Sequence, residues 1–394
     1  MDLENIFKAY DIRGIFPGQL DETVAERLGR AIVVFFNAKK IGVARDMRLG
    51  SPELQAALVK GITEQGCDAV DFGLCSTDEY YFCISKTNLA AGAMVTASHN
   101  PKQYNGFKIT GKKASPIGEE TGLLEIKRLV AENSFPRARR AGKVEKKDML
   151  AAFQKMCLAF VGKKNFKKMR VAVDFGNGMA SQTAMGAFKK LPVKIIPVCY
   201  GLDGGFPNHE ANPLVPENRK LIEETVAAEK ADLGIAFDGD ADRCFFIDDR
   251  GRFVPGDFIT GLLAKNILQK KKGLVLFDLR CSKFVPRTIE KSGGKWKMCR
   301  VGHSFIKQEM KKTGAVFAGE LSGHYYYKFR KEGYVSDNGL IPALQIMELL
   351  SIEGKKLSEL ICVAEKEFFV SGEINSEVPD KAAKMKELEG HYRP

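Results

Sequence analysis

Three stretches of the chain repeat one pattern of apolar and polar residues. In each stretch a short apolar run ends in an aspartate, and a turn, a longer amphipathic stretch and a second short apolar run follow. The first runs are residues 42–46, 171–174 and 274–278. Short apolar runs that alternate with longer amphipathic stretches predict β-strands joined by helices. The pattern therefore indicates an α/β chain.

Local signals set the expected ends of these elements. After the first strand we expect a helix with Ser51 as its N-cap and Pro52 at its first position, which Gly66 ends before a strand at 69–72. After the second strand, a turn at 176–178, a helix to about residue 190 and a strand at 193–198 are expected. After the third, a helix to about 291 and a strand at 296–301 are expected.

The spacing of the pattern indicates three related domains. The strand-ending aspartates, Asp46, Asp174 and Asp278, are 128 and 104 residues apart, which is the spacing of domains and not of a solenoid. We expect three α/β/α domains with mixed, mostly parallel sheets, which bind ligands at the carboxyl ends of their strands. Polar or turn-rich segments at 133–147 and 248–256, and a change in composition near residue 365, divide the chain into domains 1–147, 148–252 and 253–365.

Composition narrows the class of protein. The 394 residues are 44% hydrophobic and 28% charged, which excludes a disordered chain. The nine cysteines are scattered without a Cys-x-x-Cys pair, as in a reduced, cytoplasmic protein. The first residues lack the features of a secretory signal, and no apolar run approaches the roughly 20 residues of a membrane span. We expect a soluble protein with no membrane partner.

The basic surplus is the remaining feature of the composition. Lys and Arg number 61 against 49 Asp and Glu, a formal net charge of +12. The basic residues are dispersed, mostly in pairs, and no tract interleaves them with aromatic residues as nucleic-acid binding would need. We predict a basic, solvated surface that attracts small anionic substrates at most, and no nucleic-acid partner.

The first candidate for chemistry is the segment Thr-Ala-Ser-His-Asn-Pro at residues 96–101. Ser98 lies in a tight loop beside His99, and Lys108 follows ten residues later. A serine with adjacent proton-transfer groups suits a nucleophile or a phosphoryl carrier. The same residue types also form ordinary turns for backbone reasons alone.

The second candidate is the segment Asp-Gly-Asp-Ala-Asp-Arg at residues 238–243, between two expected strands. Asp238, Asp240 and Asp242 repel one another, so their concentration is costly unless a cation lies among them, and hard oxygen ligands suit Mg²⁺. A calcium EF-hand is excluded because Arg243 stands where its loop needs glycine. A solvated acidic turn, and a phosphatase with Asp238 as nucleophile, remain alternatives.

Three weaker signals complete the set. Gly-Glu-Leu-Ser-Gly-His at 319–324 presents Glu320 and Ser322, which suit sugar hydroxyls, although a polar turn has the same residues. Arg280 and His303 precede it and bring cationic or hydrogen-bonding groups to a strand-end cleft. Near the N-terminus, Arg13 offers a planar fork to a phosphate or is simply a surface arginine on a strand.

Taken together and in this order, these segments resemble the α-D-phosphohexomutase family, most closely its phosphomannomutase/phosphoglucomutase branch. The resemblance runs from residue 7 to about 375 and includes Ala-Tyr-Asp-Ile-Arg-Gly at 9–14. It implies reversible phosphoryl transfer between the 1- and 6-positions of mannose or glucose phosphates, through a phosphoserine. A hexose 1,6-bisphosphate serves as intermediate and activator. Phosphoglucosamine mutases resemble the chain too, but usually carry glutamine before the serine of the 319–324 segment.

The resemblance also implies roles for single residues. It places one Mg²⁺ on Asp238, Asp240, Asp242 and the phosphorylated Ser98. The expected proton-transfer groups are His99 and Lys108, and Arg13 is expected beside the phosphoserine. The expected substrate contacts are Tyr10, Arg243, Arg280, His303, Glu320 and Ser322.

One departure from the family concerns the end of the chain. The family has a fourth domain whose loop binds the non-reacting phosphate of the substrate. Residues 369–375 resemble the opening strand of that domain, and no such loop follows. We therefore expect residues 366–394 to be the incomplete start of a fourth domain. The rival hypothesis is a truncated, catalytically deficient sugar-phosphate-binding protein. The sequence does not predict the oligomeric state.

Overall fold

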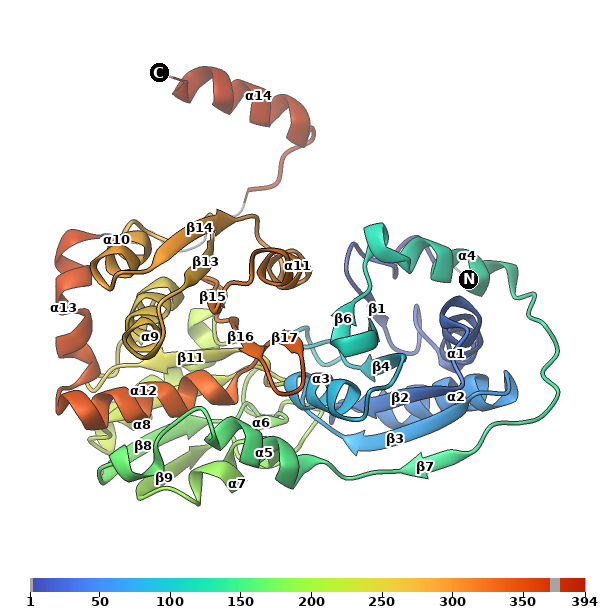
Figure 1. The fold of residues 1–394 in the computed structure, drawn as a ribbon, viewed down its shortest axis with the longest axis horizontal. Coiled ribbons are helices and arrows are strands. Elements are labelled where there is room, and N and C mark those ends of the chain that lie inside the picture. The colour runs from blue at the N-terminus through green and yellow to red at the C-terminus, as the bar shows by residue number, and fades with distance from the viewer. Residues whose placement is uncertain (1–2, 369–375, 394) are drawn as a thin grey trace.

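The computed structural model describes residues 3–368 and 376–393, so the strand expected at 369–375 lies outside the described residues. The first domain forms one lobe, and the second and third domains together form the other (Figure 1). The last helix, α14 (Lys381–Tyr392), has an exposed surface all round and projects away from both lobes (Figure 1).

The first domain is built on a sheet with the strand order β1–β5–β4–β2–β3–β7, and β6 pairs with β5. Helices α1, α2 and α4 enclose one apolar cluster against this sheet, whereas α3 contributes to a cluster shared with the other two domains. The elements are β1 (Ile12–Ile15), α1 (Glu22–Phe36), β2 (Lys40–Arg45), α2 (Ser51–Glu64), β3 (Asp68–Leu74), α3 (Thr77–Lys86), β4 (Ala91–Val95), β5 (Tyr104–Gly111), β6 (Ser115–Pro116), α4 (Leu123–Glu132) and β7 (Val144–Lys146), with short 3-10 turns at Lys112–Ala114 and Glu119–Thr121.

The second domain contains a sheet in the order β12–β11–β10–β8–β9. Its elements are α5 (Leu150–Leu158), a 3-10 turn (Lys163–Asn165), β8 (Met169–Asp174), α6 (Ala180–Thr183), α7 (Met185–Phe188), β9 (Val193–Val198), α8 (Pro216–Ala228), β10 (Leu233–Phe237), β11 (Cys244–Ile247) and β12 (Phe253–Val254).

The third domain contains a sheet in the order β14–β13–β15–β16–β17. Its elements are α9 (Gly256–Lys270), β13 (Leu274–Asp278), α10 (Phe284–Lys291), β14 (Lys295–Cys299), α11 (His303–Thr313), β15 (Phe317–Gly319), β16 (Tyr325–Phe329), β17 (Tyr334–Asp337), α12 (Leu340–Glu353) and α13 (Leu357–Glu367).

The three sheets share one topology, which confirms the prediction of three related α/β/α domains. The strand that leads to the aspartate, β2, β8 or β13, lies between two parallel neighbours, and the next strand along is antiparallel. Parallel pairs do not predominate, because each sheet has as many antiparallel as parallel pairs among the described strands. The sheets are mixed, as expected, but "mostly parallel" is wrong.

Two local predictions are also corrected. Helix α2 has Gly50 as its N-cap, because the Ser51 hydroxyl donates to Asp46 Oδ1 (2.6 Å) instead of capping the helix. The single helix expected up to residue 190 is broken into α6 and α7. The Gln154 side chain approaches the break and donates to the carbonyl of Thr183 (3.1 Å), an acceptor that a continuous helix would use itself.

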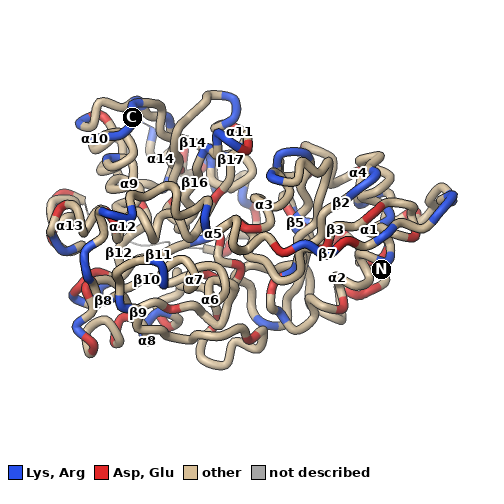
Figure 2. Tube along the Cα trace, turned by 60° about the horizontal axis from the view of Figure 1, so that its bottom comes forward, with Lys and Arg blue, Asp and Glu red and all other residues tan. Residues whose placement is uncertain are grey.

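Basic and acidic residues are spread along the chain in both lobes. Lys and Arg are interspersed with Asp and Glu on both lobes (Figure 2), as the dispersed pairs in the sequence predict. Among the described helices, none is both long and apolar enough to cross a bilayer.

Candidate active site

Three equivalent hairpin loops converge where the domains meet. They join the third strand of each shared motif to the antiparallel strand beside it, and they comprise residues 96–103 after β4, 238–243 after β10 and 320–324 after β15. We call them the serine, aspartate and glutamate hairpins. Their shared position in the fold explains why three segments far apart in sequence lie together. All three principal sequence motifs are therefore at the carboxyl ends of strands, where α/β sheets bind ligands.

The serine hairpin presents Ser98 to the aspartate hairpin. Ser98 is buried and has a left-handed backbone with φ +51°. Its N–H donates to Thr96 Oγ1 (2.9 Å), and its hydroxyl donates to Asp238 Oδ2 (3.1 Å). The His99 Nδ1 atom is 3.4 Å from the same hydroxyl. The backbone thus points the hydroxyl at the carboxylates, with an imidazole beside it.

An arginine that the sequence analysis missed holds this hairpin. Arg48 is buried, and its backbone N–H donates to Asp46 Oδ1 (3.0 Å). Its guanidinium donates to four carbonyl groups of the serine hairpin and the start of β5, those of Ser98, Asn100, Pro101 and Tyr104. The only sequence signal was its place two residues after a strand-ending aspartate, the place that Arg280 occupies after Asp278.

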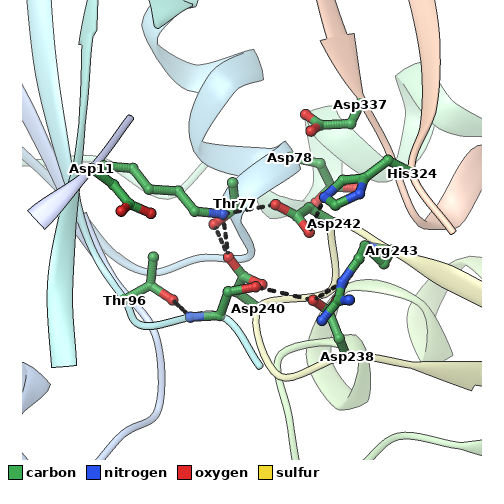
Figure 3. Close-up of polar contacts among 12 residues, drawn as sticks. Asp11, Thr77, Asp78, Thr96, Asp238, Asp240, Asp242, Arg243, His324 and Asp337 are labelled. Atoms are coloured by element: carbon green, nitrogen blue, oxygen red, sulfur yellow. Dashed lines mark hydrogen bonds and ion pairs between the residues drawn. The ribbon is translucent and has the colours of Figure 1, made fainter. Parts of the chain in front are cut away.

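The aspartate hairpin concentrates three buried carboxylates. Oxygen atoms of Asp238, Asp240 and Asp242 lie within 4.8 Å of one another. Arg243 Nε donates to Asp238 (2.7 Å), and Lys108 Nζ from β5 donates to Asp240 and Asp242 (2.7 and 2.8 Å) (Figure 3). Lys108 thus joins the first domain to the carboxylates of the second.

The surroundings push the pKa values of these groups apart. Burial and the neighbouring aspartates outweigh Arg243 and raise the pKa of Asp238 to about 7. For Asp240, Lys108 and hydroxyl hydrogen bonds outweigh burial and lower the pKa. Burial opposes the charge of Lys108, but Asp240 and Asp242 raise its pKa well above the usual value. Burial and Arg243 lower the pKa of His99.

The aspartate hairpin fits a hard divalent cation. Among the described residues, Asp240 Oδ1 and Asp242 Oδ1 are buried and have no hydrogen-bond partner, which is costly for a carboxylate oxygen. The loop also lies close against the serine hairpin, since a Cβ at Gly239 would be 2.6 Å from the Ser98 carbonyl oxygen. Oxygen ligands of this kind, close to the Ser98 hydroxyl, suit Mg²⁺.

The glutamate hairpin is held by neutral donors. Glu320 is buried, and its carboxylate accepts from the Gly302 N–H (3.1 Å) and from the Tyr326 hydroxyl. Ser322 Oγ lies 3.1 Å from His324 Nδ1. The backbones of His324 and Arg243 form an antiparallel bridge, which aligns this hairpin with the aspartate hairpin.

The remaining predicted residues lie around these hairpins. Arg13 pairs with Asp11 (2.8 Å) and donates to the Ala97 carbonyl (3.2 Å) in the serine hairpin. The Tyr10 ring meets His303, at the start of α11, with ring centroids 6.0 Å apart. His303 in turn stacks toward His324, with centroids 6.5 Å apart.

Arg280 lies next to the glutamate hairpin. Its guanidinium pairs with Asp278 (2.8 Å), and the same carboxylate accepts from the Leu321 N–H (3.1 Å). All the residues singled out from the sequence thus lie on the three hairpins or on the segments that border them.

Two other residues near the carboxylates carried no signal in the sequence. Thr77, at the start of α3, donates its hydroxyl to Asp240 Oδ2 (2.6 Å). Asp337 of β17 forms a buried ion pair (2.8 Å) with Lys307, which belongs to the same short segment as His303, and Asp337 shares a group of possible metal ligands with His324 and Asp242. The contacts of Thr77 and Asp337 join residues that are far apart in sequence, so no local motif marks these two.

The chain matches three family models in succession. They describe phosphoglucomutase/phosphomannomutase α/β/α domains I, II and III and match residues 4–137, 149–251 and 255–366. Proteins described as phosphohexose mutases from Xanthomonas campestris pv. campestris are 40% identical over 387 residues, which is 98% of this chain and 86% of theirs. The phosphomannomutase of Escherichia coli K12 is 39% identical over 394 residues, with the same coverage.

A solved structure agrees with these matches. A phosphoglucomutase/phosphomannomutase family protein from Burkholderia thailandensis superposes with a TM-score of 0.82 at 32% identity, over 89% of this chain and 78% of that chain. The similarity therefore extends through all three domains and the hairpins between them.

Proposed function

The chain belongs to the phosphoglucomutase/phosphomannomutase family of α-D-phosphohexomutases, and from that premise we propose that it moves a phosphoryl group reversibly between the 1- and 6-positions of a hexose phosphate. The observation that carries the proposal is the Ser98 hydroxyl, buried and hydrogen-bonded to Asp238 at 3.1 Å beside two further carboxylates. A hydroxyl among carboxylates is suited to carry a phosphoryl group once a cation offsets the charge.

The cation we propose is Mg²⁺, held by Asp238, Asp240, Asp242 and the phosphorylated Ser98. When bound, it supplies positive charge that offsets the oxygens of the transferring phosphoryl group. Within the aspartate hairpin, Asp240 Oδ1 and Asp242 Oδ1 are buried oxygens without a hydrogen-bond partner. Arg243 orients Asp238 through its backbone N–H (3.1 Å) and its guanidinium (2.7 Å).

Transfer begins with the free hydroxyl of a bound hexose monophosphate. That hydroxyl attacks the phosphorus of phospho-Ser98, the bond from phosphorus to Ser98 Oγ breaks, and a hexose 1,6-bisphosphate forms. Lys108 and His99 are the candidates for taking the proton from the hexose hydroxyl and for returning a proton to the departing Ser98 Oγ. After the bisphosphate turns end for end, its other phosphoryl group returns to Ser98 Oγ.

Turning the sugar requires contacts that accept it in two orientations. Glu320 is held from two sides by Gly302 and Tyr326, so its carboxylate is fixed before a sugar arrives. We propose that Glu320 and Ser322 hold two sugar hydroxyls that exchange places. Tyr10, Arg13, Arg243, Arg280 and His303 contact the phosphate groups or line the cleft.

Two other functions compete with this proposal. The first is a phosphatase that uses Asp238 as nucleophile, with Arg243 donating to both oxygens of that carboxylate. A binding protein without turnover is the second. Among substrates, mannose and glucose phosphates are proposed first because Glu320 precedes Leu321 and Ser322 in the hairpin, and glucosamine phosphate is the alternative.

A coupled assay tests the proposal. Mannose 1-phosphate, glucose 1-phosphate and glucosamine 1-phosphate are supplied in turn, with Mg²⁺ and the matching 1,6-bisphosphate as primer, and the 6-phosphate product is measured. We expect product from at least one of the first two sugars, and a loss of about 10⁴-fold or more in Ser98→Ala, because the nucleophile is gone. Ser115→Ala is the matched control, since that hydroxyl lies in the same domain and donates to the Lys112 carbonyl.

The assay also separates the rivals. Turnover that is unchanged in Ser98→Ala would falsify the phosphoserine mechanism. Phosphate release that survives Ser98→Ala and disappears in Asp238→Asn would identify a phosphatase. Calorimetric binding of a sugar phosphate with no product from any of the three substrates would identify a binding protein.

A further inference from the structure

Outside the candidate active site, three potential metal ligands meet at the edge of the second domain. Asp174 is the last residue of β8, Cys199 follows β9, and His209 lies in the loop that returns toward α8. One ligand atom from each lies within 4.8 Å of the others. His209 Nε2 is 2.8 Å from Asp174 Oδ2 and 3.4 Å from Cys199 Sγ. The neighbouring parallel strands place the first two side by side, and the loop brings the third.

Hydrogen bonds around Asp174, Cys199 and His209, which we call the trio, orient their ligand atoms toward one another. His209 Nδ1 lies 2.9 Å from the Glu210 carbonyl, which can only accept, so Nδ1 carries a proton and Nε2 faces the other two ligands. Asp174 Oδ1 accepts from the Gly176 N–H (2.8 Å), which leaves Oδ2 for the cluster. A histidine that donates one ring N–H to a carbonyl and presents the other nitrogen is the usual arrangement of a metal-binding imidazole.

The spacing is close to that of tetrahedral zinc. Zinc bond lengths imply separations of about 3.6 Å between nitrogen and sulfur and about 3.3 Å between nitrogen and oxygen. The observed separations are 3.4 Å and 2.8 Å. On those bond lengths the contact between Asp174 and His209 must lengthen by about half an ångström. Cys199 and His209 are partly buried, and the Asp174 side chain is buried.

From this arrangement we propose that Asp174, Cys199 and His209 form a second metal site, selective for a thiolate-binding ion such as Zn²⁺ and distinct from the carboxylate site for Mg²⁺. A thiolate and an imidazole favour zinc over magnesium, which prefers oxygen ligands. This site does not depend on the proposed mutase activity.

Without a metal, His209 and Asp174 form an ion pair beside the Cys199 thiol. Burial opposes the charge on His209, but its hydrogen bonds to Asp174 and Cys199 outweigh burial and raise its pKa to about 11. Metal binding therefore replaces two protons, one from the imidazolium Nε2 and one from the Cys199 thiol, and both protons pass to the buffer. That exchange makes the site weaker than one built from ligands already deprotonated.

The position of the site links it to the catalytic loops. The loop that carries His209 packs on Arg48, whose guanidinium lies 5.1 Å from the centroid of the Phe206 ring. The turn after Asp174 leads to Met179, whose N–H donates to the Gly239 carbonyl (2.9 Å) in the aspartate hairpin. A metal at the trio would fix both segments to the ends of β8 and β9.

Cobalt is the probe for the test, because Co²⁺ takes zinc sites and gives a charge-transfer absorption only when a thiolate binds it. The full chain is stripped with a chelator, saturated with Mg²⁺ to fill the carboxylate site, and titrated with Co²⁺ and then with Zn²⁺. We expect one equivalent of Co²⁺ to produce the thiolate band, and Zn²⁺ to abolish it by displacement. We also expect Zn²⁺ to raise the thermal unfolding temperature.

Variants assign the site. Cys199→Ser should lose the band, and His209→Gln should weaken Co²⁺ binding by about 100-fold or more. Cys299→Ser is the matched control, because Cys299 ends the equivalent strand of the third domain, opposite Asp278. It should keep the band. No thiolate band in the unmodified chain, or a band unchanged in Cys199→Ser, overturns the proposal, and the first of these outcomes needs no variant to fold.

Discussion

The aspartate and glutamate hairpins occupy equivalent places in two related domains, yet they are held in different ways. Besides Arg243 of its own domain, the carboxylates of the aspartate hairpin have partners in the first domain, where Thr77, Ser98 and Lys108 all donate to them. The Glu320 carboxylate accepts its hydrogen bonds from its own domain, where Gly302 and Tyr326 are the donors, although the backbone of this hairpin also bridges to Arg243 of the second domain.

The difference follows from charge. Three buried carboxylates repel one another, so one domain alone cannot stabilise them, and a cationic side chain from a neighbour lowers the cost. A single carboxylate is satisfied by neutral donors close to it in the chain. The hydrogen bonds to the three aspartates are therefore complete only with the first domain in place. The Glu320 carboxylate has both of its donors within its own domain.

Among changes that compare the two hairpins, the largest effect is expected from Asp240→Asn. The change removes the carboxylate that Lys108 and Thr77 share, and it removes a proposed metal ligand. We expect mutase turnover in the coupled assay to fall by about 10³-fold or more. Mg²⁺ should raise the unfolding temperature of the unmodified chain but not that of the variant.

Asp232→Asn is the control for that change, because Asp232 lies just before β10, at the opposite end of the same strand, and accepts from the Arg170 N–H (2.7 Å). It should leave turnover and the Mg²⁺ response intact. If Asp240→Asn kept its Mg²⁺ response, the aspartate hairpin would lose its assignment as the metal site.

A smaller effect is expected from Glu320→Gln in the other hairpin. The substitution keeps the shape of the side chain and removes one charge-assisted hydrogen bond to a sugar hydroxyl, worth about 1.5–3 kcal/mol. We expect kcat/KM for the sugar phosphate to fall about 10- to 100-fold. Labelling of Ser98 by a hexose 1,6-bisphosphate should show the same end point as in the unmodified chain, and the Mg²⁺ response should persist. A loss as severe as that of Asp240→Asn would break the contrast between the two hairpins.

The smallest effect is expected from Thr77→Val, which tests the contact between domains alone. The valine removes one hydroxyl donor to Asp240 while Lys108 remains, so the cost should be about 1 kcal/mol, or roughly five-fold in kcat. Thr87→Val removes a hydroxyl that donates to the Cys83 carbonyl (2.6 Å) at the other end of α3, and it should leave kcat unchanged. Equal effects of the two changes on kcat would mean that α3 acts only through its own stability.

The residues of the site that could be predicted are those that lie in short sequence motifs. Ser98, the three aspartates and Glu320 each stand in a motif whose residue types already suggest a chemistry. The three strand-ending aspartates likewise predicted three related domains. The structure shows why they repeat: each aspartate accepts a hydrogen bond from the backbone N–H two residues later and so forms the same turn.

The parts that could not be predicted depend on contacts with backbone or across domains. Arg48 binds carbonyl groups, which carry no side-chain signature. Lys307 and Asp337 pair from two different elements, α11 and β17. The break between α6 and α7 depends on Gln154 from another helix. In each case the partner is defined only after the chain has folded, so periodicity along the sequence does not contain it.

The close approach of the aspartate and serine hairpins limits which substitutions can be accepted during evolution. A single methyl group at Gly239 would have to fit where the Ser98 carbonyl oxygen lies 2.6 Å away, in another domain. Relief would require the serine hairpin to retreat, and its position is fixed by the reaction proposed for Ser98. A larger residue at position 239 and a shift of the serine hairpin are therefore each harmful when they occur alone. Ser98, which lies 141 residues earlier in the chain, restricts position 239 to glycine, so the two domains must evolve together at this contact.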